Sequence, residues 1–106
     1  MVYENVLETI GKTPMIHLAR VCKDIPAKVY GKVEAYNPGN SAKDRIALFM
    51  LEEAERKGQI KPGDTIIEAT SGNTGYSLAM ICSLKGYKCV LTVTSKASQA
   101  KPSLLR

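Results

Sequence analysis

The sequence predicts an α/β fold built on a parallel, doubly wound sheet, with helices on both faces in a three-layer arrangement. Patterns typical of strand, helix, strand, helix and strand follow one another over residues 27–93. Right-handed crossovers turn this order into a parallel sheet. Residues 87–93 are almost continuously apolar, as in a strand buried on both faces. A chain of 106 residues is long enough for one domain of modest stability.

The first part of the chain predicts short elements. Residues 4–10 have the spacing of a short helix that ends at Gly11, and residues 15–18 predict a strand after a Thr-Pro break. Residues 27–34 alternate between long polar and small or apolar side chains, which predicts a half-buried strand of the parallel sheet. The single histidine, His17, falls on the first strand, where we expect a half-exposed residue without a chemical role.

A turn that leads directly into an amphipathic helix comes next. Residues 37–40, Asn-Pro-Gly-Asn, form a turn in which the proline fixes φ and one of the last two residues takes a positive φ. Ser41 is predicted to be the N-cap, with Asp44 as the acid of a shortened capping box. The helix stops at Gly58 and is expected to pack on the sheet. Its apolar stripe consists of Ile46, Ala47, Met50, Leu51 and Ala54.

The remaining elements complete the sheet. They are a strand at 65–68, a helix at 74–85 and a strand at 87–93. A further helix is expected to start at Ser95 or Ser98. Pro102 favours Ser98, because from there the proline falls just past the first turn instead of inside the helix.

The net charge of +5 does not indicate a nucleic-acid partner. Residues 1–68 hold ten basic and ten acidic side chains, so the excess comes from five basic residues after position 68. These are scattered singly without aromatic residues between them, and we expect no nucleic-acid binding. No apolar run reaches the roughly 18 residues of a membrane span, and the N-terminus lacks an export signal. We therefore expect a cytoplasmic protein that does not contact a membrane.

The three cysteines indicate neither a disulfide framework nor a metal site. Cys22, Cys82 and Cys89 show no CxxC spacing, and the last two lie in apolar runs. Buried cysteine behaves as a small apolar residue, so we expect three free thiols and no bound metal.

Two polar segments have the residue types of a chemical site. Lys43 lies close to a helix N-terminus, where the positive end of the helix dipole favours a neutral, nucleophilic amine. Residues 70–75, Thr-Ser-Gly-Asn-Thr-Gly, lie between a strand and a helix, so their side chains and backbone N–H groups form an anion cradle. Both segments are expected at carboxyl ends of strands, and hence at one edge of the sheet. Either segment alone would more simply be a solvated lysine or an ordinary helix cap.

Together the two segments resemble a known family. The sequence NPGNSAKDR at 37–45 and ATSGNTG at 69–75 occur with the expected strand and helix patterns between them. Residues 12–15, 61–66 and 85–88 fit the same family. Over nearly its whole length the chain therefore resembles the fold-type II pyridoxal-phosphate enzymes, and among them the cysteine synthase and cystathionine β-synthase family.

The resemblance implies a role for each matching residue. Lys43 would be the catalytic lysine, which binds the aldehyde of pyridoxal 5'-phosphate as a Schiff base and later removes the Cα proton of the substrate. Asn73 would also bind the cofactor, by a hydrogen bond to the oxygen on the cofactor ring. The substrate carboxylate would be held by Thr70, Ser71, Gly72, Asn73 and Thr74. The implied reaction is loss of a β-substituent from an amino acid, followed by addition of a sulfur nucleophile.

The resemblance also implies a longer enzyme. Residues 1–36 resemble part of the larger domain of this family, and residues 37–106 resemble its N-terminal small α/β domain, truncated. The favoured activity is that of cysteine synthase, from O-acetylserine and sulfide, and the complete enzyme is expected to be a homodimer. The alternative is cystathionine β-synthase, which joins serine to homocysteine. A non-catalytic fragment or partner-binding module with the same fold is an alternative of another class.

Overall fold

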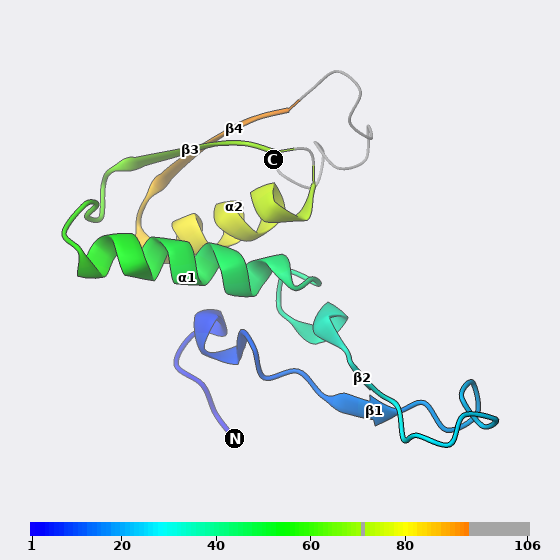
Figure 1. Ribbon diagram of the computed structural model, residues 1–106. Helices are drawn as coiled ribbons and strands as arrows, with labels where there is room; N and C mark the ends of the chain where they lie inside the picture. Colours follow the sequence, from blue (N-terminus) through cyan, green and yellow to red (C-terminus); the bar gives the residue numbers. More distant parts are fainter. Residues whose placement is uncertain (71, 94–106) are drawn as a thin grey trace.

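The computed structural model describes residues 1–70 and 72–93 (Figure 1). Its elements in chain order are the 3-10 helix η1 (Val6–Thr9), β1 (Met15–His17), β2 (Tyr30–Lys32), the 3-10 helix η2 (Glu34–Tyr36), α1 (Lys43–Arg56), β3 (Thr65–Ala69), α2 (Asn73–Lys85) and β4 (Lys88–Thr92). The long helices and the last two strands closely match their predicted ranges. The helix expected from Ser95 or Ser98 lies outside the described residues.

A βαβ unit forms the centre of the structure. β3 and β4 pair in parallel, with Ile66 opposite Cys89 and Ile67 opposite Val90, and α2 makes the crossover between them. Parallel strands need such a crossover, since a tight turn can only join antiparallel neighbours. The α/β class and the parallel pairing predicted for this part of the chain are confirmed.

One predicted strand lies in another sheet. β2 pairs antiparallel with β1, with His17 opposite Tyr30, in a separate two-stranded sheet. The prediction that residues 27–34 join the parallel sheet is therefore wrong. Their alternation indicates a strand but not its partner, and strands that follow one another in the chain usually pair with each other.

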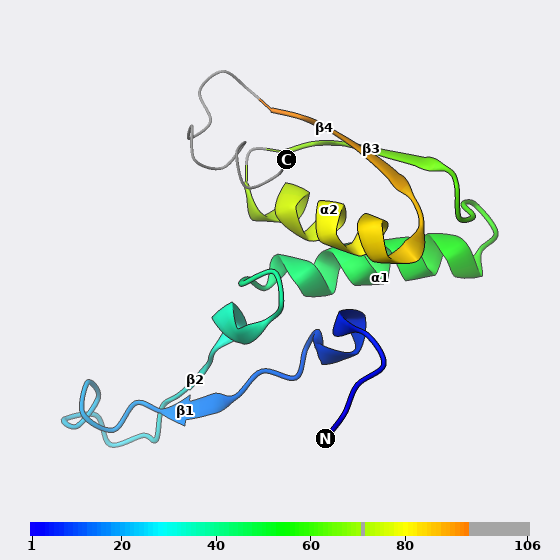
Figure 2. The same ribbon diagram turned by 180° about the vertical axis from the view of Figure 1, so that it is seen from behind.

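α2 lies between the sheet and α1 (Figures 1 and 2). It is apolar on nearly all sides, which suits a helix that is covered on two sides. The buried core contains Ala47 and Leu51 of α1, Leu78, Ile81 and Cys82 of α2, and Tyr87. The prediction that the stripe of α1 packs on the sheet is wrong, because α1 packs on α2 instead. Ile46 and Met50, which were assigned to that stripe, remain 46% and 44% exposed.

Among the described residues, helices cover only one face of the β3–β4 sheet. Side chains alternate along both strands between half-buried and exposed. On the open face Ile67 is 67% and Val90 is 47% exposed, so β4 is not buried on both faces as its sequence predicts. No helix in residues 1–70 and 72–93 is both long and apolar enough to span a membrane.

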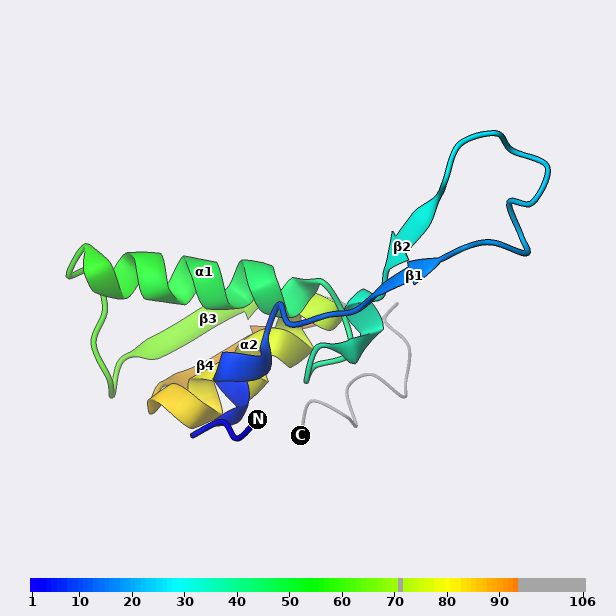
Figure 3. The same ribbon diagram turned by 90° about the horizontal axis from the view of Figure 1, so that it is seen from below.

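The N-terminal segment packs beneath α1, and the hairpin of β1 and β2 projects away from the helices (Figures 1 and 3). η1 is closed by a capping box in which the Asn5 side chain accepts from Leu7 N, and the Glu8 side chain accepts from Asn5 N. Leu7 and Ile10 contact the buried core. The short helix predicted at 4–10 is therefore present as a 3-10 helix, whereas His17 on β1 is exposed.

Candidate active site

The turn before α1 sets the position of Lys43. Asn40 N donates to Asn37 O at 2.8 Å, and Asn40 takes the positive φ of 67° that the turn requires. Ala42, not Ser41, is the N-cap residue, so that prediction is wrong by one position. The Ser41 hydroxyl nevertheless accepts a hydrogen bond from Lys43 N at 3.2 Å. Lys43 is thus the first residue of α1, and its side chain is exposed.

Asp44 does not form the predicted capping box. Its carboxylate is fully buried and accepts from Gly39 N and from the Ser77 hydroxyl of α2, each at 2.5 Å. Gly39 has to be glycine, because a Cβ there would overlap this carboxylate. A buried carboxylate is stable only when hydrogen bonds replace its hydration, and these donors supply that replacement.

Arg45 joins α1 to the N-terminal segment. It pairs with Glu34 at 2.5 Å, and its guanidinium also donates to Gly11 O and to the Thr13 hydroxyl, both at 3.1 Å. The hydrogen bond from Arg45, and after it the one from Thr13, lowers the pKa of Glu34 from 4.5 to about 2. Arg45 thus ties the first turn of α1 to residues 11–13.

Asn37 is a buried centre of this network. It is 1% exposed, and its amide nitrogen donates to the Glu34 side chain at 3.1 Å and to Ser41 O at 2.9 Å. Its amide oxygen accepts from Gly11 N at 2.8 Å. The turn that carries Lys43 is therefore fixed from both sides.

The second polar segment begins where β3 ends. The Thr70 hydroxyl accepts from Gly72 N at 3.3 Å and from Gly75 N at 3.1 Å, and a Cβ on Gly75 would overlap the Thr70 side chain. Gly72 is the N-cap residue of α2, and no side-chain hydrogen bond caps the helix there. Asn73, the first residue of α2, is exposed, while Thr74 is half-buried. Ser71 lies outside the described residues.

The two segments meet at one end of the helix pair. α1 and α2 run side by side in the same direction, so Lys43 and Asn73 begin them at the same end (Figures 1 and 3). The bond between Asp44 and Ser77 holds these ends together. The expected juxtaposition is present, but its predicted cause is wrong for Lys43, since the strand before it is not part of the parallel sheet.

The residues at this end fit a cofactor with an aldehyde and an amino-acid substrate. An exposed amine, an exposed amide and a half-buried hydroxyl lie on the first turns of two adjacent helices. The Thr70 hydroxyl accepts from Gly75 N, but no side chain of the described residues accepts from the N–H groups of Asn73 and Thr74. Such free N–H groups at a helix start favour an anion such as a carboxylate.

Potential metal ligands and thiols also occur among the described residues. In residues 1–70 and 72–93 no three potential metal ligands gather. The three cysteines are free, as predicted. Burial, and then the neighbouring Cys89, raises the pKa of Cys82 to about 12, which keeps this thiol protonated at neutral pH.

Sequence reasoning missed two residues of this arrangement. The sequence places Ser77 only within the predicted helix at 74–85, and Asn37 only within the predicted turn. A serine directly before the apolar run Leu78 to Cys82 is a usable signal, because a hydroxyl on a buried helix face needs a partner. The sequence alone does not identify that partner as Asp44.

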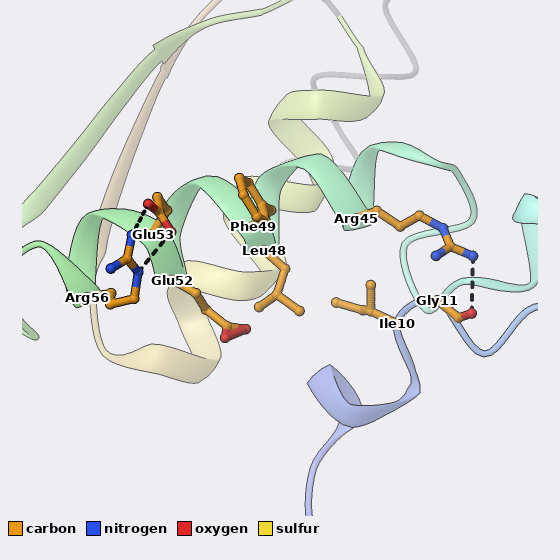
Figure 4. Close-up of a pocket in the computed structure, with 8 residues that line it drawn as sticks. All are labelled: Ile10, Gly11, Arg45, Leu48, Phe49, Glu52, Glu53 and Arg56. Atoms are coloured by element: carbon orange, nitrogen blue, oxygen red, sulfur yellow. Dashed lines mark hydrogen bonds and ion pairs between the residues drawn. The ribbon is translucent and has the colours of Figure 1, made fainter.

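A groove of about 530 Å³ lies on the other side of α1 (Figure 4). The side chains of Ile10 and Leu48 point toward each other in it. Its lining consists of Ile10 and Gly11 and, from one face of α1, of Arg45, Leu48, Phe49, Glu52, Glu53 and Arg56. No predicted site residue lines it, so this groove is separate from the candidate site.

Comparisons with known proteins agree with the arrangement. A family model described as "Pyridoxal-phosphate dependent enzyme" matches residues 6–106. The chain is 54% identical over 103 residues to a cysteine synthase of Staphylococcus aureus (strain N315), which covers 97% of this chain and 33% of that protein. It is 47% identical over 104 residues to the cystathionine beta-synthase of Rattus norvegicus, which covers 96% of this chain and 18% of that protein.

Solved structures show the same likeness. A hydrogen sulfide-producing enzyme from Fusobacterium nucleatum matches with a TM-score of 0.93 and 43% identity, over 100% of this chain and 35% of that one. An O-ureido-L-serine synthase matches with a TM-score of 0.89 and 43% identity, over 100% and 33%. These likenesses confirm the predicted fold class. The chain spans about a third of the length of the cysteine synthase that it matches.

Proposed function

The chain belongs to the pyridoxal-phosphate dependent enzyme family, as its motifs predict, and from this we propose that Lys43 is the lysine that holds the cofactor. We further propose that the whole protein carries out β-replacement in sulfur amino-acid synthesis, most simply as a cysteine synthase that uses O-acetylserine and sulfide. The observation that carries this proposal is the exposed Lys43 amine at the start of α1, beside the start of α2.

Each residue of the site has a defined task in this proposal. When bound, pyridoxal 5'-phosphate supplies the electron sink that makes the Cα proton of an amino acid removable. Lys43 holds the cofactor aldehyde through Nζ. Once this nitrogen is free again, it takes the Cα proton of the substrate.

The start of α2 would hold the substrate and the cofactor ring. We assign the substrate carboxylate to Thr70, Ser71, Gly72, Asn73 and Thr74, together with the N–H groups of Asn73 and Thr74, which receive no side-chain hydrogen bond from the described residues. The Asn73 amide would also donate to the ring oxygen of the cofactor. Thr70 shapes the loop at the same time, because its hydroxyl already accepts from Gly72 N and Gly75 N.

The choice of substrate is a finer proposal. Identity to the cysteine synthase is 54%, against 47% to the cystathionine beta-synthase, which favours O-acetylserine and sulfide over serine and homocysteine. Turnover of both substrate pairs by the full-length protein decides between the two activities. We expect that protein to be a homodimer, which sedimentation measures.

The test of the cofactor assignment is Lys43→Ala in the full-length protein. We expect loss of the visible absorbance of the bound cofactor and of cofactor fixed by borohydride, with unchanged far-UV circular dichroism, because the exposed side chain contributes no core volume. Lys61→Ala, another exposed lysine, is the matched control and should keep both signals. Cofactor fixed by borohydride in Lys43→Ala would refute the assignment.

A further inference from the structure

Side-chain hydrogen bonds connect α1 to the α2 region at both ends of the helix pair. Near the helix starts, the Ser77 hydroxyl donates to Asp44 at 2.5 Å. Near the helix ends, Glu55 accepts from Lys85 at 2.9 Å and from the Tyr87 hydroxyl at 2.6 Å. Only the first of these two connections lies beside the candidate active site.

The connection at the helix starts is sealed from water. Asp44 and Ser77 are both 0% exposed, and Asp44 also accepts from Gly39 N. Two neutral donors thus replace the hydration of a carboxylate. Apolar side chains of the same volume would pack these helices as well, so the polar pair is better explained by the direction that a hydrogen bond imposes than by stability.

The bonded atoms span the residues that the site needs. Gly39 belongs to the turn before α1, and Asp44 directly follows Lys43. Ser77 lies one helical turn after Asn73, on the same helix. The two hydrogen bonds that Asp44 accepts, from Gly39 N and from the Ser77 hydroxyl, therefore fix the start of α1 against the start of α2.

We propose that Asp44 and Ser77 are positioning residues, which hold the Lys43 amine at a fixed position relative to the first turn of α2. Neither touches a reacting atom, and their task rests on the function proposed above for Lys43. Misplacement of a reacting group by about 1 Å costs on the order of 100-fold in rate. Loss of this connection should thus lower turnover more than it lowers substrate binding.

The experiment compares Ser77→Ala with Tyr87→Phe in the full-length protein. Each substitution removes one hydroxyl that donates to a carboxylate of α1, but at opposite ends of the helix pair. Ser77→Ala is expected to lower kcat by roughly 10- to 100-fold at nearly constant KM and to slow the fixing of cofactor on Lys43. Tyr87→Phe should leave both unchanged. Equal effects of the two variants on kcat and on cofactor fixing would show that Ser77 contributes only to helix packing, and would overturn the proposal.

A readout without cofactor separates this proposal from the function proposed for Lys43. Hydrogen exchange of peptides that contain Gly39 and residues 70–76 should be faster in Ser77→Ala than in Tyr87→Phe. If wild-type Lys43 takes no cofactor while this difference persists, the assignment of Lys43 fails and the positioning connection stands. Identical exchange in the two variants overturns the connection itself. Asp44→Asn, which keeps the side-chain volume, gives the same comparison if Ser77→Ala does not fold.

Discussion

Glu34 joins the N-terminal segment to the turn before α1 and to α1 itself. It accepts hydrogen bonds from Arg45, Thr13 and Asn37, and these side chains come from three different parts of the chain. The bonds stabilise the ionised carboxylate, so the pKa of Glu34 falls from 4.5 to about 2. The contribution of Glu34 to stability is therefore fully present above about pH 4.5 and is lost as the pH falls toward 2.

Glu34→Gln tests this pH dependence. The variant should unfold at a lower temperature than the wild type at pH 7, because Arg45 loses its charged partner. Between pH 4.5 and 2 its melting temperature should fall less steeply than that of the wild type, because it lacks the titrating group. Thermal unfolding by circular dichroism over this pH range measures both effects.

The control for this prediction is Glu52→Gln, an exposed acid on the same helix as Arg45. It should follow the wild type over the whole pH range. If the melting temperatures of the wild type and Glu34→Gln fell equally steeply with pH below 4.5, the assigned role of Glu34 would be contradicted.

At the residue scale the sequence identifies chemical types better than partners. Lys43 and Asn73 are assigned from their motifs, and the structure places both on first turns at one end of the helix pair. The pairing of Asp44 with Ser77 was not predicted, because the two residues lie 33 positions apart in the chain. Pairings over such distances depend on how the helices pack, which local patterns do not contain.

At the scale of elements, the polar loop between β3 and α2 depends on a close contact inside it. Gly75 is buried in the first turn of α2, and its Cα faces the Thr70 side chain. The Thr70 hydroxyl accepts from Gly75 N, so Thr70 cannot move away without breaking this bond. Thr70 and the first turn of α2 therefore act as one unit.

Gly75→Ala should destabilise the protein by about 1–3 kcal/mol, the usual effect of an added methyl group without space. Urea unfolding of the wild type and the variant measures this difference. Gly31→Ala is the control, because a Cβ there would meet Leu18 at an ordinary 3.7 Å. Its effect should stay within about 0.5 kcal/mol. A Gly75→Ala protein as stable as the control would show that the loop adapts freely.

The boundaries of the elements follow from the sequence, while their packing does not. Gly58, which was predicted to end the first long helix, comes just after α1, and Gly86 follows α2 directly. Periodicity places α1, α2, β3 and β4 because it acts within each element. The pairing of β2 with β1, and the packing of α1 on α2, depend on competition between distant surfaces.

The molecule as a whole is extended for its length. Its radius of gyration is 16.7 Å, whereas a compact domain of about 100 residues has roughly 13 Å. The projecting hairpin contributes to this value (Figure 3). The open face of the parallel sheet presents Ile67 and Val90 to solvent. Exposed apolar sheet surface of this kind favours association.

The 106-residue chain on its own should therefore associate and melt broadly. Because it spans only about a third of the matched cysteine synthase, it should also show no β-replacement with either substrate pair. Light scattering after size exclusion measures the first property. Ile67→Lys should shift the chain toward the monomer, because it places a charge on the open face. Val21→Lys, at a position that is also exposed but lies in the hairpin loop, should not. A wild-type chain that is a sharply melting monomer, or that turns over substrate, would contradict this prediction.

The assignment of residues 1–36 to a larger domain stays a prediction at this scale. The structure does connect this segment to α1, through Arg45 and through Leu7 and Ile10.

The connection between Arg45 and Gly11 also fixes an order of events during synthesis. The two residues are 34 positions apart, and ribosomes add roughly 5–20 residues per second. Gly11 therefore leaves the ribosome about 2–7 s before Arg45 does. During this interval Leu7 and Ile10 have no helix to cover them, so the N-terminal segment docks only after α1 has emerged.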